Sequence, residues 1–214
     1  MNTQIDIAMI SGDGTKPRQE RSDAAANRKL ILATAEKLFA ERGVEAVTMA
    51  DIAQAAAVGK GTLYRRYVNK PQLCLALMDK QVLTFQNEVL DRLREQSIRQ
   101  LPTMEQLNLF LESLVYFVDR HMPLLCEVQR AGLVSTVHEQ QMPHIWQYMT
   151  TKGLLNAAVQ TGELSPAIDT EYIADALLAP LRVALFRFQR EVRGFSLARI
   201  VTGLQTWVDA LAAL

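Results

Sequence analysis

The segment from Thr48 to Lys70 constrains this chain most, because it holds the start signals of two short helices on either side of a tight turn. Thr48 and Asp51 have the spacing of a capping box, in which a hydroxyl accepts a backbone N–H at the helix start. The carboxylate of Asp51 also lies where the helix dipole favours negative charge. A helix is therefore predicted to begin at Met49.

A second short helix is predicted from Lys60, after a turn at Val58 and Gly59. Leu63 is expected to face inward, whereas most other side chains carry positive charge, a hydroxyl or a phenol. Such groups bind phosphates and the edges of bases. This helix is therefore a candidate for contact with nucleic acid; the simpler interpretation is a solvated basic face.

Three patterns in this region resemble the helix-turn-helix of the tetracycline-repressor (TetR) family of bacterial regulators. They are R-x-x-I-L-x-x-A-x-x-L-F-x-x-x-G from Arg28, T-x-x-D-I-A from Thr48 and G-T-L-Y-x-x-Y from Gly61. The resemblance covers residues 27 to 77. It implies a three-helix DNA-binding head and a helical body that forms a homodimer and encloses a small-molecule ligand.

Two positions of the turn depart from the family's pattern. Ala57 stands where the family usually has Gly, which adopts a positive φ readily. Gly59 stands where the family usually has Ser or Thr, so this turn lacks a side-chain cap. Because Gly is a tolerated N-cap, the predicted fold is unchanged.

The resemblance assigns DNA contacts to the second helix of the motif and to its flanks. Of the two adjacent arginines, one is expected to make a bidentate contact to guanine and the other to face away. Phosphate contacts are expected from Thr48, Tyr64, Tyr67 and Lys70. The full set of candidate DNA-binding residues is Arg28, Thr48, Lys60, Gly61, Thr62, Leu63, Tyr64, Arg65, Arg66, Tyr67 and Lys70.

Composition favours helices throughout the chain. The 214 residues include only 10 Gly and 7 Pro, and 49% of them are hydrophobic, which is ample for a core. The predicted class is all-α, with an N-terminal three-helix helix-turn-helix domain joined by a long helix to a C-terminal helical bundle. The expected division is a disordered tail at 1–22, the DNA-binding domain at 23–70 and the regulatory and dimerisation domain at 71–214.

Apolar periodicity and the positions of Pro and Gly give the helix layout. Asn69 is the expected N-cap of the long helix, and a kink is predicted at Pro180. The expected helices cover 23 or 27 to 42, 71 to about 94, 104 to about 121, 123 to about 137, 143 to 162, and 166 or 169 to 194, with further helices beginning at 49, 60 and 196.

Charge is unevenly distributed along a chain whose formal net charge is zero. Residues 16–70 hold 11 Lys and Arg against 6 Asp and Glu, a net charge of +5, whereas residues 71–214 hold 12 against 15, a net charge of −3. A basic head indicates a nucleic-acid partner met at one end. Lys16, Arg18 and Arg21 either follow the DNA backbone or belong to a solvated tail.

The two cysteines, Cys74 and Cys126, do not form a disulfide framework, and their expected role is that of small buried hydrophobes. Residues 1–10 lack the basic start of a signal peptide. No stretch approaches the roughly 20 apolar residues that span a bilayer. The sequence therefore predicts a cytoplasmic protein without membrane contact.

A palindromic site is read by a two-fold dimer whose recognition helices lie about 34 Å apart. The resemblance therefore implies a homodimer, and the last two predicted helices carry broad apolar stripes for its interface. The alternative is that these stripes are the core of the body. The candidate interface residues are Leu177, Leu181, Leu185, Phe188, Ile200, Gly203, Leu204, Trp207 and Leu211.

The middle helices combine apolar and hydrogen-bonding side chains in a way that suits a small apolar or aromatic effector, which the resemblance implies. The alternative is an ordinary core, since Met and aromatic residues at helical spacing usually form one. The candidate pocket residues are Phe117, His121, Met122, Cys126, His144, Trp146 and Met149.

Enzyme signatures do not fit. His138 and Glu139 lack the second His of a zinc protease, and there is neither a phosphate-binding loop nor a nucleophile elbow. No cofactor or metal is expected. The predicted function is a homodimeric repressor that binds a palindromic operator on double-stranded DNA and is released by a small molecule. The alternative is a ligand-independent DNA-docking protein whose helical body binds another protein.

Overall fold

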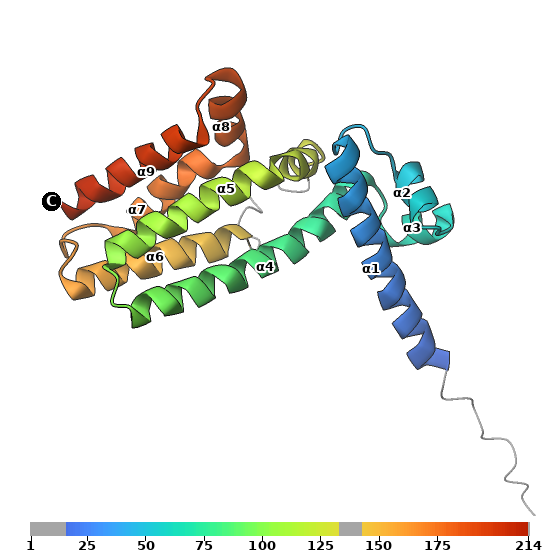
Figure 1. Ribbon diagram of the computed structural model, residues 1–214, viewed down its shortest axis with the longest axis horizontal. Helices are drawn as coiled ribbons and strands as arrows, with labels where there is room; N and C mark the ends of the chain where they lie inside the picture. Colours follow the sequence, from blue (N-terminus) through green and yellow to red (C-terminus); the bar gives the residue numbers. More distant parts are fainter. Residues whose placement is uncertain (1–15, 133–142, 214) are drawn as a thin grey trace, which may run out of the picture. The chain divides into compact units, whose positions relative to one another are not determined.

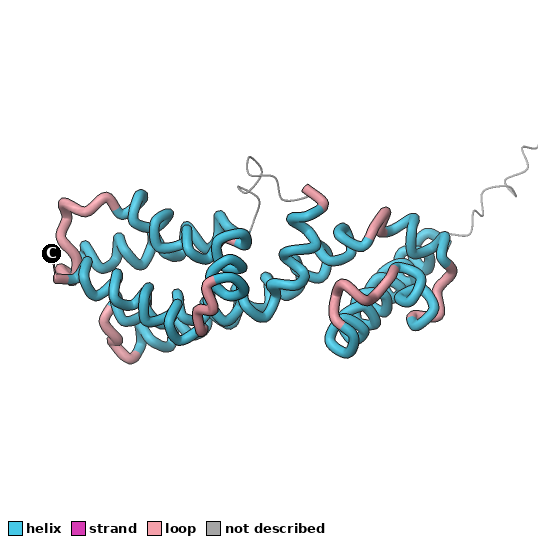
Figure 2. The backbone as a smooth tube through the Cα atoms, turned by 90° about the horizontal axis from the view of Figure 1, so that it is seen from above, coloured by secondary structure: helices cyan, strands magenta, loops and turns pink. Residues whose placement is uncertain are grey.

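The computed structural model describes residues 16–132 and 143–213, and every regular element within these ranges is helical (Figures 1 and 2). This confirms the predicted all-α class. The helices are α1 (Lys16–Arg42), α2 (Met49–Ala55), α3 (Lys60–Arg66), α4 (Lys70–Ile98), α5 (Thr103–Arg130), α6 (Pro143–Thr161), α7 (Thr170–Leu178), the 3₁₀ turn η1 (Ala179–Leu181), α8 (Val183–Arg187), the π turn η2 (Phe188–Val192) and α9 (Leu197–Ala212).

The chain divides into two compact units, Met1–Val68 and Asn69–Leu214, which we call the head and the body. The head holds α1, α2 and α3 around a small core. That core includes Ile31, Ala35 and Phe39 of α1, together with Ile52 and Leu63 of the two short helices.

Helix α1 begins at Lys16, within the segment 1–22 for which the sequence predicts a disordered tail. Pro17 lies in the first turn of α1, where its missing N–H leaves no helical hydrogen bond unmade. The alanines at 24–26 then favour continuation of the helix. The part of the predicted tail at residues 1–15 lies outside the described residues.

The predicted capping box is present at the start of α2. The Asp51 backbone N–H donates to Thr48 Oγ1 at 3.2 Å, and the Thr48 backbone N–H donates to Asp51 Oδ2 at 2.8 Å. The hydrogen bonds from the Thr48 backbone and hydroxyl, helped by Arg42 and opposed by burial, hold the pKa of Asp51 below its ordinary value. Ala57 in the following turn adopts φ +51°, in the left-handed region that favours glycine.

In the body, α5 is the central helix. It packs against α4, α6 and α9, and α6 packs against α7 (Figure 1). The apolar residues of α5 are accordingly buried along most of its length. They include Leu107, Phe110, Leu111, Leu114, Val115 and Val118.

Helix α5 runs through Pro123 without a break, so the predicted division into helices at 104–121 and 123–137 is wrong. Pro123 is exposed, whereas Leu124 and Val128 after it are buried. Packing of these residues against the body therefore outweighs the backbone hydrogen bond that Pro removes from the Asp119 carbonyl. The predicted end of the second helix, at residue 137, lies outside the described residues.

The single kinked helix predicted up to Gly194 is also wrong. Asp169 caps α7, where its carboxylate accepts from the backbone N–H groups of Glu171 and Tyr172 at 3.1 Å. The helix ends before Pro180, which lies within the 3₁₀ turn η1. Arg182 after this turn has an extended backbone at ψ 137°. Two short elements, α8 and η2, replace the rest of the predicted helix.

A residue distant in sequence caps the N-terminus of α5. Pro102 at the N-cap supplies no side-chain hydrogen bond. Instead, the Glu163 carboxylate accepts from the backbone N–H groups of Thr103 at 2.9 Å and Met104 at 3.0 Å. Burial opposes ionisation of Glu163, but these bonds and one from the Thr161 hydroxyl outweigh it and lower the pKa of Glu163 below its ordinary value.

Helix α4 has 29 residues and ends at Ile98 rather than near Arg94. At 1.5 Å per residue its length is about 43 Å. As predicted, Asn69 is its N-cap, and the Asn69 side chain accepts from the Gln72 backbone N–H at 3.0 Å. None of the helices within the described ranges is long and apolar enough to cross a membrane.

Candidate functional site

The exposed face of α3 is the first candidate surface. Lys60, Gly61, Tyr64 and Arg65 are exposed, and Thr62 is half-buried. Gly59 caps the helix without a side chain, in an extended conformation at ψ 141°. Along its length α3 therefore presents an ammonium group, a phenol and a guanidinium group to the exterior.

The two adjacent arginines of α3 have different environments. The Arg66 guanidinium donates to the backbone carbonyl of Ala24 on α1, so it joins two helices of the head. Arg65 is exposed on the outer face. The structure thus distinguishes two residues that the sequence leaves equivalent, and Arg65 is the one turned outward.

Two of the predicted contact residues belong to the core of the head. Leu63 is fully buried, and Tyr67 is only 5% exposed. The Tyr67 hydroxyl is itself buried and has no hydrogen-bond partner among the described residues. Neither side chain is available on the surface, because both are buried.

The remaining predicted phosphate contacts also differ from one another. Arg28 is exposed on α1, whereas the Thr48 hydroxyl is engaged with Asp51, to which it donates at 2.8 Å. Lys70 lies in the body, where its ammonium group pairs with Glu127 of α5 at 3.8 Å and its side chain is only 19% exposed. Lys70 is therefore placed as a link between α4 and α5.

Beside this ion pair lies Cys74, which is fully buried. Burial raises the pKa of the Cys74 thiol to about 12, with a further contribution from Glu127 that Lys70 partly offsets. The thiol is protonated at neutral pH, and Cys74 acts as a small core residue. Cys126 is half-buried, with its sulfur 3.9 Å from a guanidinium nitrogen of Arg187.

An aromatic cluster joins α4, α5 and α6 in the body. Phe85 and Phe117 stack with ring centroids 4.3 Å apart. Trp146 meets Phe85 and Phe110 edge-on at 6.0 and 5.7 Å. His121 lies 4.3 Å from the Phe117 ring and contacts the Phe117 carbonyl oxygen through Nδ1 at 2.7 Å.

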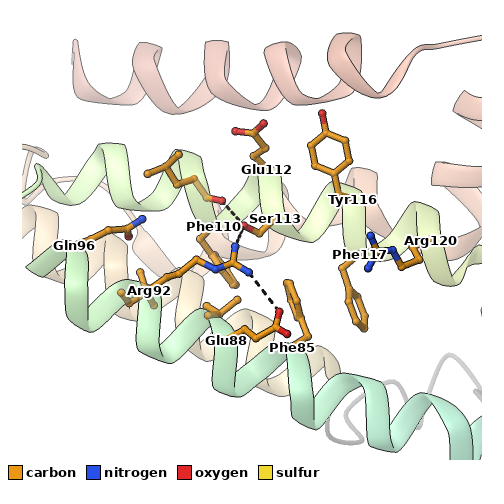
Figure 3. A pocket seen from close by; sticks show the side chains of 13 residues that line it. Phe85, Glu88, Arg92, Gln96, Phe110, Glu112, Ser113, Tyr116, Phe117 and Arg120 are labelled. Atoms are coloured by element: carbon orange, nitrogen blue, oxygen red, sulfur yellow. Dashed lines mark hydrogen bonds and ion pairs between the residues drawn. The ribbon is translucent and has the colours of Figure 1, made fainter.

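A cavity of about 430 Å³ opens next to this cluster, between α4 and α5 (Figure 3). Arg92 of α4 crosses toward α5, where it donates to Ser113 Oγ at 3.1 Å, and it pairs with Glu88 at 3.5 Å. The lining residues are Phe85, Glu88, Val89, Arg92, Leu93, Gln96, Leu109, Phe110, Glu112, Ser113, Tyr116, Phe117 and Arg120.

Among the predicted pocket residues whose side chains the structure describes, Phe117 alone lines this cavity. His121 and Trp146 support it through the aromatic cluster. Met122 is half-buried against the core, and Met149 is exposed. The Cys126 side chain does not line the cavity and lies beside Arg187. The side chain of His144 is outside what the structure describes.

The α4 side of the cavity was missed by sequence reasoning. Phe85, Val89, Leu93 and Gln96 recur at helical spacing, which is the available signal, but the same spacing also describes a helix packed against a core. The cavity lining also includes two Arg and two Glu residues, none of which is among the predicted pocket residues.

The predicted dimer interface separates into buried and exposed residues. Leu177, Leu181, Ile200 and Leu204 are buried in the core of the body, as the alternative interpretation held. Large apolar side chains are nevertheless exposed nearby, among them Val192, which sequence reasoning missed. The exposed residues of the region are Leu185, Phe188, Val192, Gly203 and Trp207, and Leu211 is half-buried.

The chain is similar to known regulators. A family model described as bacterial regulatory proteins, tetR family, matches residues 31–77. The HTH-type transcriptional regulator SAR0097 of Staphylococcus aureus (strain MRSA252) is 34% identical over 140 residues, covering 64% of this chain and 70% of that protein.

Two solved structures have a similar fold. A protein of Saccharomonospora viridis in complex with choline has a TM-score of 0.68 at 18% identity, covering 86% of this chain and 96% of that one. The TetR-family repressor FadR of Thermus thermophilus, in complex with lauroyl-CoA, has a TM-score of 0.62 at 20% identity, covering 85% and 92%.

Proposed function

This chain belongs to the tetR family of bacterial regulatory proteins, and we propose that it is a homodimeric repressor that binds a palindromic operator and is released by a small molecule. It is a regulator of transcription and not an enzyme. As a reader of chromosomal DNA it would work in the cytoplasm.

The outer face of α3 is the observation that carries this proposal. Arg65 is exposed where a helix-turn-helix presents its second helix to the major groove, and its guanidinium can bind guanine in a bidentate manner. Lys60, Thr62 and Tyr64 offer an ammonium group and hydroxyls to the backbone phosphates. Sequence preference then comes from Arg65 and orientation comes from its neighbours.

Exposed apolar side chains on consecutive elements of the body support dimerisation. Leu185, Phe188, Val192 and Trp207 lie on α8, η2 and α9 and are 43%, 47%, 70% and 52% exposed. Exposed large apolar side chains of this kind mark an interaction surface where they adjoin one another. A second copy of the chain fits because a palindrome presents two identical half-sites.

The cavity between α4 and α5 supports release by a ligand, since two neighbours of the same fold hold small molecules. Release requires that the ligand bind the free dimer more tightly than the operator-bound dimer. By linkage, the ratio of the two ligand affinities equals the factor by which ligand weakens operator binding. A ligand with equal affinity for both states has no effect on the operator.

Footprinting of the purified full chain on fragments of its own genome tests the proposal. We expect protected inverted repeats whose half-site centres lie about 10 base pairs, or a multiple of that, apart. The Arg65→Ala variant should lose preference for one base pair in each half-site. Protection of single, unrepeated sites would contradict the dimeric mode.

The same operator then serves to test the alternative function, in which the body binds another protein. Compounds that bind the purified chain are titrated into the operator complex. Release of DNA supports the repressor, whereas operator affinity unchanged at saturating ligand favours a ligand-independent docking protein.

A further inference from the structure

We propose that the cavity between α4 and α5 takes an uncharged, flat aromatic molecule carrying a hydroxyl or N–H group, which donates a hydrogen bond to Gln96. This inference rests on the proposed ligand-responsive function and names the class of molecule for that site. The size, the charges, the aromatic rings and one buried oxygen of the cavity each restrict the ligand.

The size of the cavity suits a small, elongated molecule. Its volume of about 430 Å³ lies in the lower half of the range of roughly 300–1,000 Å³ that ligand pockets have. Phe85 at one end of the α4 wall and Gln96 at the other are 11 residues apart, which is about 16 Å along a helix. Two fused rings with one polar substituent fit such a slot.

The charges of the lining balance. Arg92 is engaged by Glu88 and by Ser113 (Figure 3). Glu112 and Arg120 carry opposite charges and are eight residues apart on α5, which is about 12 Å. A ligand with several phosphates needs an excess of cationic donors. The lining offers no such excess, so an acyl-CoA or a nucleotide is disfavoured.

The arrangement of the rings disfavours an organic cation. A quaternary amine binds to the open faces of several aromatic rings. Here the faces of Phe85 and Phe117 stack on each other at 4.3 Å, and His121 lies at the same distance from the Phe117 ring. Because Phe85 and Phe117 stack on each other and do not flank an open space, they offer apolar contact to a flat molecule rather than a cage for a cation.

Gln96 supplies the polar specificity. Its Oε1 atom is buried and has no hydrogen-bond partner among the described residues, although Gln96 lines the cavity. A buried acceptor without a partner is unfavourable, and a donor that reaches it gains the full benefit of the bond. A site of this kind prefers a molecule with a donor over the same molecule without one.

Isothermal titration of the full chain at pH 7 with 2-naphthol tests the proposal, because this probe is flat, uncharged and carries one hydroxyl. We expect a dissociation constant below about 1 mM, as for a small ligand of this size. Its methyl ether, 2-methoxynaphthalene, keeps the rings but cannot donate, and should bind about tenfold more weakly. Lauroyl-CoA and choline should bind more weakly than 2-naphthol.

Three variants test whether 2-naphthol binds in the cavity. Gln96→Leu should weaken 2-naphthol about tenfold and abolish the difference between 2-naphthol and its methyl ether. Leu109→Trp fills the cavity from a partly exposed position and should weaken both probes. Gln81→Leu is the matched control on α4 outside the lining, and should bind both probes as the parent chain does. Circular dichroism establishes that each variant is folded.

Equal affinity for 2-naphthol and its methyl ether, absence of 2-naphthol binding, tighter binding of choline or lauroyl-CoA, or binding insensitive to Gln96→Leu and Leu109→Trp would each overturn the proposal. Its failure is distinguishable from failure of the repressor mechanism. If 2-naphthol binds as expected without releasing operator DNA, the proposed ligand class is supported and the proposed release by this ligand is contradicted. If another compound releases DNA from the Leu109→Trp variant, release by a ligand is supported and the cavity is excluded as its binding site.

Discussion

Ala57 holds an unfavourable backbone conformation in the turn between α2 and α3. Its φ of +51° disfavours a residue with a Cβ atom by about 1–2 kcal/mol. Ala57→Gly removes this strain but increases the entropy of the unfolded chain, so we expect a net stabilisation of about 0.5–1 kcal/mol in urea denaturation. Ala55→Gly, at the last residue of α2, should instead destabilise the head. Destabilisation by both changes would mean that the turn is not strained.

Arg65 and Arg66 should differ in their effects on DNA binding. Arg65→Ala removes an exposed guanidinium, and should relax preference at one base position by about 1–3 kcal/mol in binding to an operator library. Arg66→Ala removes the bond to the Ala24 carbonyl, and should lower the thermal stability of the head while preserving the order of base preferences. The reverse pattern would show that the roles are exchanged.

Among the elements, α5 depends on a cap from outside its own sequence. Glu163→Ala leaves the N–H groups of Thr103 and Met104 without their acceptor, and should destabilise the body by about 1 kcal/mol in urea at pH 7. Glu95→Ala, on an exposed side chain of α4, is the control and should have little effect.

The same cap should be sensitive to pH. Because the pKa of Glu163 is lowered on folding, its contribution to stability is present above the ordinary value of 4.5 and is lost as pH falls through the folded value. The difference between the parent chain and Glu163→Ala should therefore shrink as pH falls below 4.5. A difference independent of pH would show that the carboxylate charge is not involved.

Helix boundaries set by neighbouring residues could be predicted from the sequence. Thr48, Asn69 and Ser196 are observed N-caps because the cap bonds to a backbone group three residues away. The effects of Pro123 and Pro180 on their helices were predicted wrongly. Whether a helix continues past a proline depends on the burial of residues that other helices contact. A proline removes the same bond in both places, and packing decides whether the helix continues.

The candidate site was predictable in part for the same reason. The basic face of α3 follows from residues close in sequence. The roles of Arg66, Tyr67 and Lys70 do not, because each is fixed by a residue on another element or by burial. To predict the cavity, one must know which two helix faces leave a gap between them. Apolar periodicity does not supply this, because it is the same for a filled groove and an unfilled one.

For the whole molecule, dimerisation should depend on the exposed apolar residues of α8, η2 and α9. Trp207→Glu places a charge in that surface, and should shift the protein from dimer to monomer in sedimentation and reduce operator affinity at least tenfold. Tyr172→Glu, on an even more exposed aromatic residue of α7, is the control and should remain dimeric. A dimeric Trp207→Glu protein would exclude this surface as the interface.

The pairing of Lys70 with Glu127 has a consequence for how operator binding responds to ionic strength. Each phosphate neutralised by a cationic side chain releases counterions, and contributes about 0.9 to the slope of log affinity against log salt concentration. Lys70 is engaged within the body, so Lys70→Ala should leave that slope unchanged, whereas Lys60→Ala should reduce it by about 0.9 for each half-site. The number of counterions released thus distinguishes basic residues that bind phosphates from those that pair with acidic residues of the protein.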